Sequence, residues 1–257
     1  MIDSRAIVGK LAEIDSDVSI GPFTIVEDGV TIGANTWIGP HVVIRKNTTI
    51  GKRNKIFQFT SLGEDPQYAD YQGEETFLNI GDDNVIREFC TLNRGSPAGS
   101  GVTKVGNGNL IMAYVHIAHD SILGDKVVFA NGASLAGHVE VDNHAILGGF
   151  TLVHQFCRIG AHSMTGIGTV CVKDVPPYVL AVGNVASPKG LNIRGLRRHG
   201  FDANSIDCLK KAYRVIYRHN LNLTEILSEL DRLAESDDKV EKLVKFVRTS
   251  QRGIIRK

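Results

Sequence analysis

The spacing of four of the nine histidines would bring them to one corner of a chain that coils every 18 residues. These histidines are His116, His119, His138 and His154, and His119 directly precedes Asp120. An imidazole beside a carboxylate can take a proton from a hydroxyl group near pH 7. Gly137 follows His119 by 18 positions, so its N–H could stabilise an oxyanion, and its lack of a side chain would let a carbonyl group approach. This combination predicts acyl transfer to an alcohol by general-base catalysis, without a serine or cysteine nucleophile.

Two other interpretations of the histidine group stay open. The histidines could be solvent-exposed corner residues without a chemical role, which is the ordinary interpretation of a single histidine. They could instead bind a metal, because histidine is a common ligand. However, His116 and His119 are expected on a strand and a corner and not on one face of a helix, and no acidic or cysteine ligand obviously completes a coordination shell. We therefore expect no metal and no other bound cofactor.

A six-residue repeat defines the elements that must position these residues. An aliphatic residue recurs every six positions from Ile2 to Leu62, resumes at Ile80 and, after a slip of one residue, runs on to Ile159. A helix would need a period of 3.6 and a half-buried strand a period of 2. Three six-residue edges close a triangular coil of 18 residues, and such coils stack with parallel strands about 4.8 Å apart. A glycine often follows the aliphatic residue, which we interpret as a need for corner backbone angles that other residues avoid.

Stacked coils place residues 18 positions apart above one another, as for His119, Gly137 and Gln155. The repeat is broken by loops at 63–79 and 93–104. We expect the first loop to span one coil's length, so that it bulges out without disturbing the stack. Loops on a rigid scaffold often carry binding groups.

The pattern changes near the end of the repeat, which predicts two domains. We expect a parallel β-helix over residues 1–190 and a helical domain over residues 191–257. Prolines at 176, 177 and 188 mark the exit from the β-helix. In the tail, apolar residues recur three or four positions apart, and Asn222 with Glu225 resembles a capping box at a helix start.

Composition and charge exclude several classes of protein. The chain has 257 residues and a formal net charge of +1, so wholesale binding of nucleic acid is not expected. No run of 18 apolar residues and no signal peptide is present, and the four cysteines are scattered, which suits a reducing, intracellular location. Residues 189–257 carry 16 basic and 9 acidic side chains, whereas the rest of the chain carries 13 and 19. The basic excess is either a solvated helix face or a surface for an anionic partner.

Five motifs occur in order along the chain: His116-Ile117-Ala118-His119-Asp120, Leu135-Ala136-Gly137-His138, Val153-His154-Gln155-Phe156-Cys157, Asp174-Val175-Pro176-Pro177-Tyr178 and Gly195-Leu196-Arg197-Arg198-His199-Gly200-Phe201. Together they resemble the hexapeptide-repeat UDP-N-acetylglucosamine 3-O-acyltransferase family, which begins lipid A assembly. The resemblance runs essentially from end to end.

The resemblance implies an all-β fold with an α tail, in which the parallel β-helix is left-handed. It also implies a cytoplasmic homotrimer whose active sites lie in clefts between neighbouring subunits. The expected partners are acyl carrier protein, which carries the 3-hydroxyacyl donor on phosphopantetheine, and a UDP-sugar acceptor. No nucleic acid and no integral membrane segment is expected. Both partners are anionic, which would account for the basic tail.

The resemblance also assigns roles by motif. His119 is the expected general base, Asp120 orients it, and Gly137 supplies the oxyanion N–H. The expected substrate-binding residues are Gln67, His116, His138, His154, Gln155, Asn192 and Arg198. Among these, His116 would contact the sugar, and Asn192 and Arg198 would hold the nucleotide end.

Some positions depart from the family pattern, and they cluster on the acceptor side. They are Tyr68, Asp70, Asn93, Arg194 and His199. Asp70 stands where many relatives have a lysine, which reverses a charge. A 3-amino sugar nucleotide, giving an amide, or another UDP-sugar is therefore an alternative acceptor, although we favour the unchanged one. A trimeric β-helix zinc carbonic anhydrase and a non-catalytic scaffold are weaker alternatives.

One position bears on the donor. Relatives that accept long acyl chains have a Val-Gly-Gly run where this chain has Thr165, Gly166 and Ile167. The resemblance makes Ile167 the acyl-chain ruler. A sec-butyl group in a packed groove displaces several methylenes, so we predict a shorter acyl chain than glycine-bearing relatives use.

Overall fold

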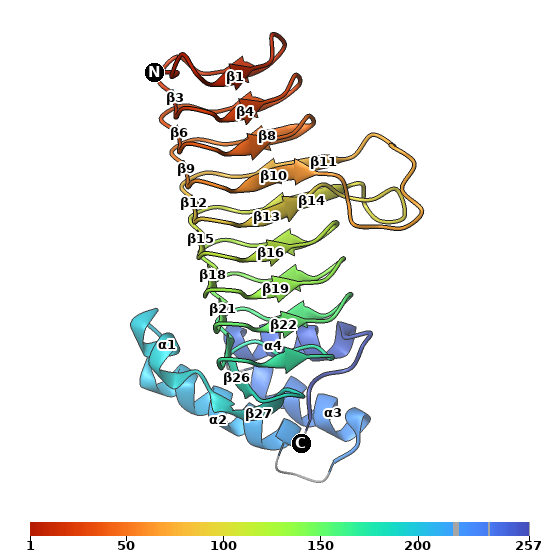
Figure 1. The fold of residues 1–257 in the computed structure, drawn as a ribbon. Coiled ribbons are helices and arrows are strands. Elements are labelled where there is room, and N and C mark those ends of the chain that lie inside the picture. Colours follow the sequence, from red (N-terminus) through yellow and green to blue (C-terminus); the bar gives the residue numbers. More distant parts are fainter. Residues whose placement is uncertain (218–220, 236, 257) are drawn as a thin grey trace.

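The computed structural model describes residues 1–217, 221–235 and 237–256. The first two thirds of the chain form a left-handed parallel β-helix, and helices gather at its C-terminal end (Figure 1). Arg218, which belongs to the basic excess of the tail, lies outside the described residues.

In the described residues the strands form three sheets, one for each side of the triangular coil. Sheet 1 contains β1 (Ile7–Val8), β4 (Ile25–Val26), β7 (Val43–Ile44), β10 (Ser61–Glu64), β13 (Thr91–Asn93), β16 (His116–Ile117), β19 (Ser134–Leu135), β22 (Leu152–Val153) and β25 (Val170–Cys171). Sheet 2 contains β2 (Glu13–Ile14), β5 (Thr31–Ile32), β8 (Thr48–Ile50), β11 (Phe77–Ile80), β14 (Val102–Val105), β17 (Ile122–Leu123), β20 (Glu140–Val141) and β23 (Arg158–Ile159). Sheet 3 contains β3 (Ser19–Ile20), β6 (Trp37–Ile38), β9 (Lys55–Ile56), β12 (Val85–Ile86), β15 (Leu110–Ile111), β18 (Val128–Phe129), β21 (Ile146–Leu147), β24 (Met164–Thr165), β26 (Val179–Val182) and β27 (Ser187–Leu191). We name the corners by the sheets that they join, in chain order: corner 1–2, corner 2–3 and corner 3–1.

The register confirms the predicted period. Ile117 pairs with Leu135, and Leu135 with Val153, so each coil advances by 18 residues. These repeat side chains point into the core, where Ile117 is fully buried. Burial of one aliphatic side chain contributes about 1.5–3 kcal/mol. A single coil cannot bury these side chains without the coils above and below it, so the coils are stable only as a stack.

The glycines after the aliphatic residues have a different cause from the one predicted. Gly148 is among those without a positive φ, and a Cβ there would lie 2.7 Å from backbone atoms of Gly166 on the next coil. Close stacking of coils therefore requires these glycines. The left-handed corner conformation instead falls on non-glycine residues such as Asp120 (φ 60) and His138 (φ 61).

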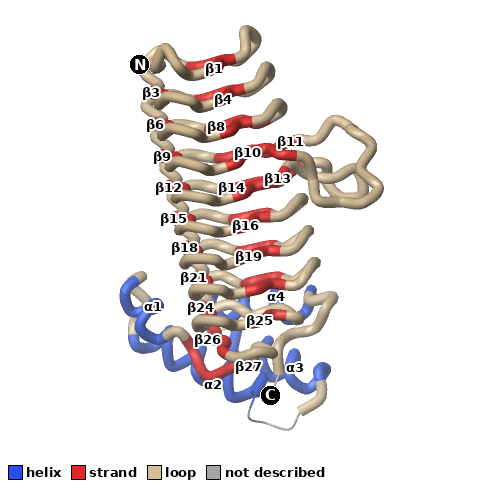
Figure 2. The backbone as a smooth tube through the Cα atoms, in the orientation of Figure 1, coloured by secondary structure: helices blue, strands red, loops and turns tan. Residues whose placement is uncertain are grey.

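The two predicted loops are shorter than expected, because strands enter both segments. Ser61 pairs with Thr91, 30 positions on, and Thr91 pairs with His116, 25 positions on. The insertions therefore add 12 and 7 residues to a coil of 18, so the first is not a full coil. The segments between strands are 65–76, here loop A, and 94–101, here loop B. Figure 2 shows both projecting from the same side of the β-helix.

The tail consists of α1 (Ile193–Arg198), α2 (Ala203–Tyr217), α3 (Leu223–Ala234) and α4 (Asp238–Thr249). The predicted capping box is present at α3, where the Asn222 side chain accepts from the Glu225 N–H and Glu225 bonds back. Apolar faces of α2, α3 and α4 share a second core that also buries Tyr178. The expected boundary after residue 190 falls inside β27, which pairs antiparallel with β26. None of the helices in the described ranges is long and apolar enough to cross a membrane.

Candidate active site

An imidazole–carboxylate pair occupies corner 1–2, just after β16. The Nδ1 of His119 lies 2.8 Å from Oδ2 of Asp120, whose side chain is 1% exposed. The left-handed backbone at Asp120 turns the chain toward β17, and its N–H donates to the Thr103 hydroxyl. Strand, corner and hydroxyl together hold the carboxylate beneath the imidazole.

Loop B supplies a partner that the sequence did not identify. Both the N–H and the hydroxyl of Ser96 donate to Oδ2 of Asp120, at 3.0 and 2.6 Å. The backbone of Gly99 covers the same carboxylate, since a Cβ there would lie 2.4 Å from Cγ of Asp120. The sequence marked this segment only as a break in the repeat, and nothing in its spacing indicated that Ser96 would face Asp120.

These contacts fix the protonation state of the pair. Burial acts to raise the pKa of Asp120, but the hydrogen bonds from His119 and Ser96 outweigh it, so this pKa lies below its ordinary value. An ionised carboxylate only accepts hydrogen bonds, so Nδ1 of His119 must donate. The other ring nitrogen, Nε2, then carries the lone pair that a base needs.

Gly137 lies against the His119 ring from the next coil. A Cβ at residue 137 would be 2.6 Å from Cε1 and 2.8 Å from Nε2 of His119, so any larger residue would displace the imidazole ring. Within the described residues the Gly137 N–H makes no hydrogen bond, while its carbonyl accepts from Phe156. A free N–H beside the base is suitably placed to donate to an oxyanion.

His138 completes the corner. Its ring meets that of His119 edge-on, with centroids 5.1 Å apart, and stacks on Phe156 at 4.5 Å. Its Nδ1 lies 3.9 Å from Oδ2 of Asp120. Burial lowers the pKa of His138, only partly opposed by Asp120, which favours a neutral ring at pH 7.

A cleft of about 440 Å³ opens beside the pair. Its lining residues come from loop A and three successive coils: Gln67, His116, Ala118, His119, Ser134, Leu135, Ala136, Gly137, Leu152, Val153 and Gln155. The Nδ1 of His116 lies 2.7 Å from the Thr91 hydroxyl, and burial lowers the His116 pKa. The structure therefore brings together the expected base, the expected oxyanion donor and three of the expected substrate-binding residues.

The departures in loop A and at the end of β13 have different surroundings. Tyr68 faces the site, with its ring centroid 6.1 Å from that of His119, and the Asp70 carboxylate raises the Tyr68 pKa. Asn93 is buried and donates to the Asp65 carbonyl at 2.6 Å, so it braces loop A. The buried Arg94 also holds loop A, because its guanidinium donates to the Asp65 carboxylate and to the Tyr71 hydroxyl.

The remaining expected site residues lie elsewhere in the chain. His154 is exposed, with Nδ1 3.1 Å from the Gln155 carbonyl, and does not line the cleft. Asn192 is buried, and its side chain caps α1 through the Gly195 N–H and donates to the His162 carbonyl. Arg198, at the end of α1, is exposed. Ile167 is 78% exposed at corner 3–1, on a different edge from His119. One chain therefore does not bring Asn192, Arg198 or Ile167 to the cleft.

Family models match two parts of the chain. The bacterial transferase hexapeptide model matches residues 11–46, 29–56 and 103–137, which lie in the β-helix. The second domain of UDP-N-acetylglucosamine O-acyltransferase matches residues 174–255, which include the helical tail. The fold and the corner site thus define a hexapeptide-repeat acyltransferase.

The chain belongs to the UDP-N-acetylglucosamine O-acyltransferase family. It is 55% identical over 200 residues to the acyl-[acyl-carrier-protein]–UDP-N-acetylglucosamine O-acyltransferase of Thiobacillus denitrificans, covering 78% of each chain. It is 53% identical to the protein of the same name from Alkalilimnicola ehrlichii, covering 77% of each. The solved UDP-N-acetylglucosamine acyltransferase of Francisella novicida superposes with a TM-score of 0.98 at 42% identity, covering 100% of this chain and 94% of that one. These names favour O-acyl transfer over the amide-forming and carbonic anhydrase alternatives.

The contact between Ser96 and Asp120 makes a prediction for this site. Replacing Ser96 with alanine removes the hydroxyl donor, and loss of a hydrogen bond to a charged group costs about 1.5–3 kcal/mol. We expect kcat to fall about tenfold. Because the carboxylate then loses a donor that favours its charged form, the Asp120 pKa should rise, which a carbon NMR titration of the carboxyl group measures.

Ser100→Ala is the matched control on loop B, because the Ser100 hydroxyl bonds the Val102 carbonyl and not Asp120. An unchanged kcat and an unchanged Asp120 titration in Ser96→Ala would show that Ser96 does not position the carboxylate.

Proposed function

We propose that the chain transfers a 3-hydroxyacyl group from acyl carrier protein to the 3-hydroxyl of UDP-N-acetylglucosamine, the first step of lipid A biosynthesis. The observation that carries this proposal is the His119–Asp120 pair held against the free N–H of Gly137. The names of the relatives supply the donor and acceptor classes.

The reaction follows from the protonation state of the pair. Nε2 of His119 takes the proton of the sugar hydroxyl while the hydroxyl oxygen attacks the carbonyl carbon of the thioester. The Gly137 N–H donates to the oxyanion that develops on the carbonyl oxygen. When the tetrahedral intermediate collapses, the C–S bond breaks and the proton on His119 passes to the departing phosphopantetheine sulfur. Asp120 stays ionised throughout and stabilises the charged imidazole between the two proton transfers.

We infer that the active enzyme is a homotrimer. The expected site residues lie at different corners: His119 and Gly137 at corner 1–2, Ile167 at corner 3–1, and Arg198 on α1 near corner 2–3. A threefold axis beside the β-helix could bring a corner of one subunit to a different corner of its neighbour. Native mass spectrometry should give three times the 28.0 kDa chain mass.

In keeping with the family resemblance, we place the enzyme in the cytoplasm and propose that it needs no metal for acyl transfer.

Acceptor binding is proposed to involve Gln67 and His116 in the cleft, with His138 along the donor path and Gln155 on the side of the pantetheine. We also propose that His154, Asn192 and Arg198 contact substrate that is bound in the cleft of a neighbouring subunit. The Tyr68 ring lies 6.1 Å from that of His119, and the Asp70 carboxylate acts on Tyr68, so we propose that acceptor choice would differ from relatives through these two residues of loop A.

The exposed Ile167 side chain makes a prediction for the donor. Each methylene buried in an apolar groove contributes about 0.8 kcal/mol, or about fourfold in kcat/KM. Replacing Ile167 with glycine should open the groove, so that the best donor becomes longer by about two or more methylenes. The measurement is kcat/KM across hydroxyacyl carrier proteins of graded length.

Ile167→Leu keeps the volume of the side chain and serves as the control, with the same best donor as wild type. An unchanged donor preference in Ile167→Gly would contradict the assignment of the ruler.

A further inference from the structure

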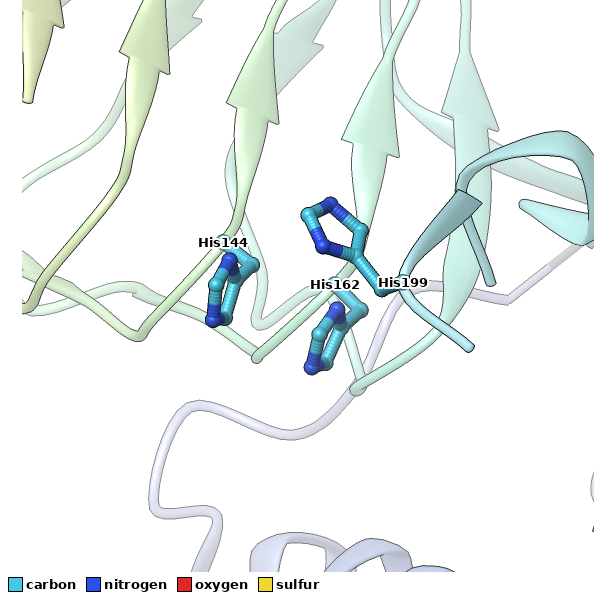
Figure 3. A group of neighbouring side chains, drawn as sticks. All are labelled: His144, His162 and His199. Carbon is cyan, nitrogen blue, oxygen red and sulfur yellow. The ribbon is translucent and has the colours of Figure 1, made fainter. Parts of the chain in front are cut away.

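Three histidines outside the cleft converge at corner 2–3. His144 and His162 are one coil apart, before β21 and β24, and His199 ends α1. The ring centroids of His144 and His162 are 4.6 Å apart, and the His199 ring lies 4.6 and 5.1 Å from them. Figure 3 shows His144 and His162 side by side, with His199 reaching toward both from the helix end.

The nitrogens of these rings lie close together, although the His144 and His162 rings are stacked, with an interplanar angle of 10°. One nitrogen of each ring lies within 4.8 Å of the other two. Tetrahedral zinc with metal–nitrogen bonds of about 2.0–2.1 Å separates its ligand atoms by about 3.4 Å. Each separation therefore needs to shorten by at most roughly 1.4 Å. The exposed His199, just after a six-residue helix, can approach the other two rings. Binding also requires the stacked His144 and His162 rings to turn, so that their lone pairs point at the same ion.

Two of the ligand rings are otherwise incompletely satisfied. Nδ1 of His144 and Nδ1 of His162 are buried and have no hydrogen-bond partner among the described residues. A buried polar atom without a partner costs about 1–3 kcal/mol in other proteins and calls for an explanation. A metal ion bound at these nitrogens would explain why they have no hydrogen-bond partner.

The electrostatic surroundings are compatible with neutral imidazoles, the form that binds metal. Burial, followed by the neighbouring His144 and His199, lowers the pKa of His162 to about 4. Burial also lowers the pKa of His144. The charged groups facing the cluster are of both signs: Lys126 and Asp125 beside His144, Lys242 beside His162, and Asp142, Asp238 and Lys239 around the adjoining cavity of about 550 Å³.

We propose that His144, His162 and His199 bind a zinc ion that ties the end of α1 to two coils of the β-helix. Imidazole nitrogens suit zinc, whereas magnesium and calcium prefer oxygen ligands. Three protein ligands leave a fourth position for water. This inference departs from the expectation that the chain binds no metal, which considered only the histidines around His119.

A second group, His119, Asp120 and His138, also has its ligand atoms within 4.8 Å of one another. There, however, Oδ2 of Asp120 already accepts from His119 and twice from Ser96. That group belongs to the proposed catalytic site, so it provides a comparison for locating the metal.

The test is equilibrium dialysis of the chelator-stripped full chain against Zn²⁺, with Co²⁺ as a spectroscopic probe of tetrahedral coordination. We expect one equivalent of metal per chain. His144→Ala, His162→Ala and His199→Ala should each weaken binding at least tenfold. His41→Ala is the matched control, because His41 also occupies a corner but stacks between Phe23 and Phe59.

Thermal unfolding keeps the test independent of variants that fold poorly. Zn²⁺ should raise the Tm of wild type and of His41→Ala, but not that of His199→Ala, whose exposed side chain is not needed for the core. No binding by wild type would overturn the proposal. Zinc binding that survives in His199→Ala would also overturn it. If His119→Ala loses zinc binding while His199→Ala retains it, the metal binds at the other histidine group and the proposal is wrong.

Discussion

Replacing His119 with alanine should lower kcat for acyl transfer by about 10²- to 10⁴-fold, the range that positioned general bases contribute. The proton of the acceptor hydroxyl then has no acceptor, because the remaining side chain over Gly137 cannot take it. KM for the UDP-sugar should change much less, since the other lining residues of the cleft remain. Steady-state kinetics with hydroxyacyl carrier protein measure both values.

The fold should survive this change. Asp120 keeps both hydrogen bonds from Ser96 and its own N–H bond to Thr103. His41→Ala, at a distant stacked corner, should keep the kcat of wild type. Turnover by His119→Ala at a rate close to that of wild type would refute the role of His119 as base.

Replacing Gly137 with alanine should be nearly as harmful, with kcat lowered about 10²- to 10³-fold, as for loss of an oxyanion-hole donor. The added Cβ would lie 2.6 Å from Cε1 of His119, so the ring must move away from both the carboxylate and the acceptor. The N–H remains, but the carbonyl that it should polarise can no longer approach as closely.

A double-mutant cycle separates this effect from general damage. Once His119 is alanine, the ring that the new methyl group would strike is absent. Gly137→Ala should therefore cost much less in the His119→Ala background than in wild type. Equal losses in both backgrounds would show that Gly137 does not act through the position of His119.

The β-helix could be predicted from the sequence because its period is a local property. Residues such as Ile117 and Leu135 point inward at fixed spacing, so their register follows from counting. The same counting placed Gly137 over His119. It could not give the cause of the regular spacing of glycines such as Gly148, which depends on how closely two coils approach.

Contacts made by the loops could not be predicted. Ser96 reaches Asp120 only because loop B folds back over corner 1–2, and no repeat phase describes that path. The convergence of His144 and His162 does follow the 18-residue spacing, but His199 joins them from a separate domain. In the proposed homotrimer, the positions of Arg198 and Ile167 relative to the cleft would depend on a neighbouring subunit, which a single chain does not specify.

Product analysis tests the central claim most directly. The full chain is incubated with 3-hydroxyacyl carrier protein and either UDP-N-acetylglucosamine or its 3-amino analogue, and the acylated position is read by mass spectrometry and NMR. We predict an ester on the 3-hydroxyl of UDP-N-acetylglucosamine, formed by wild type and about 10²-fold or more slowly by His119→Ala. Folded, trimeric wild type that acylates only the 3-amino analogue, or neither sugar, would contradict the proposed function.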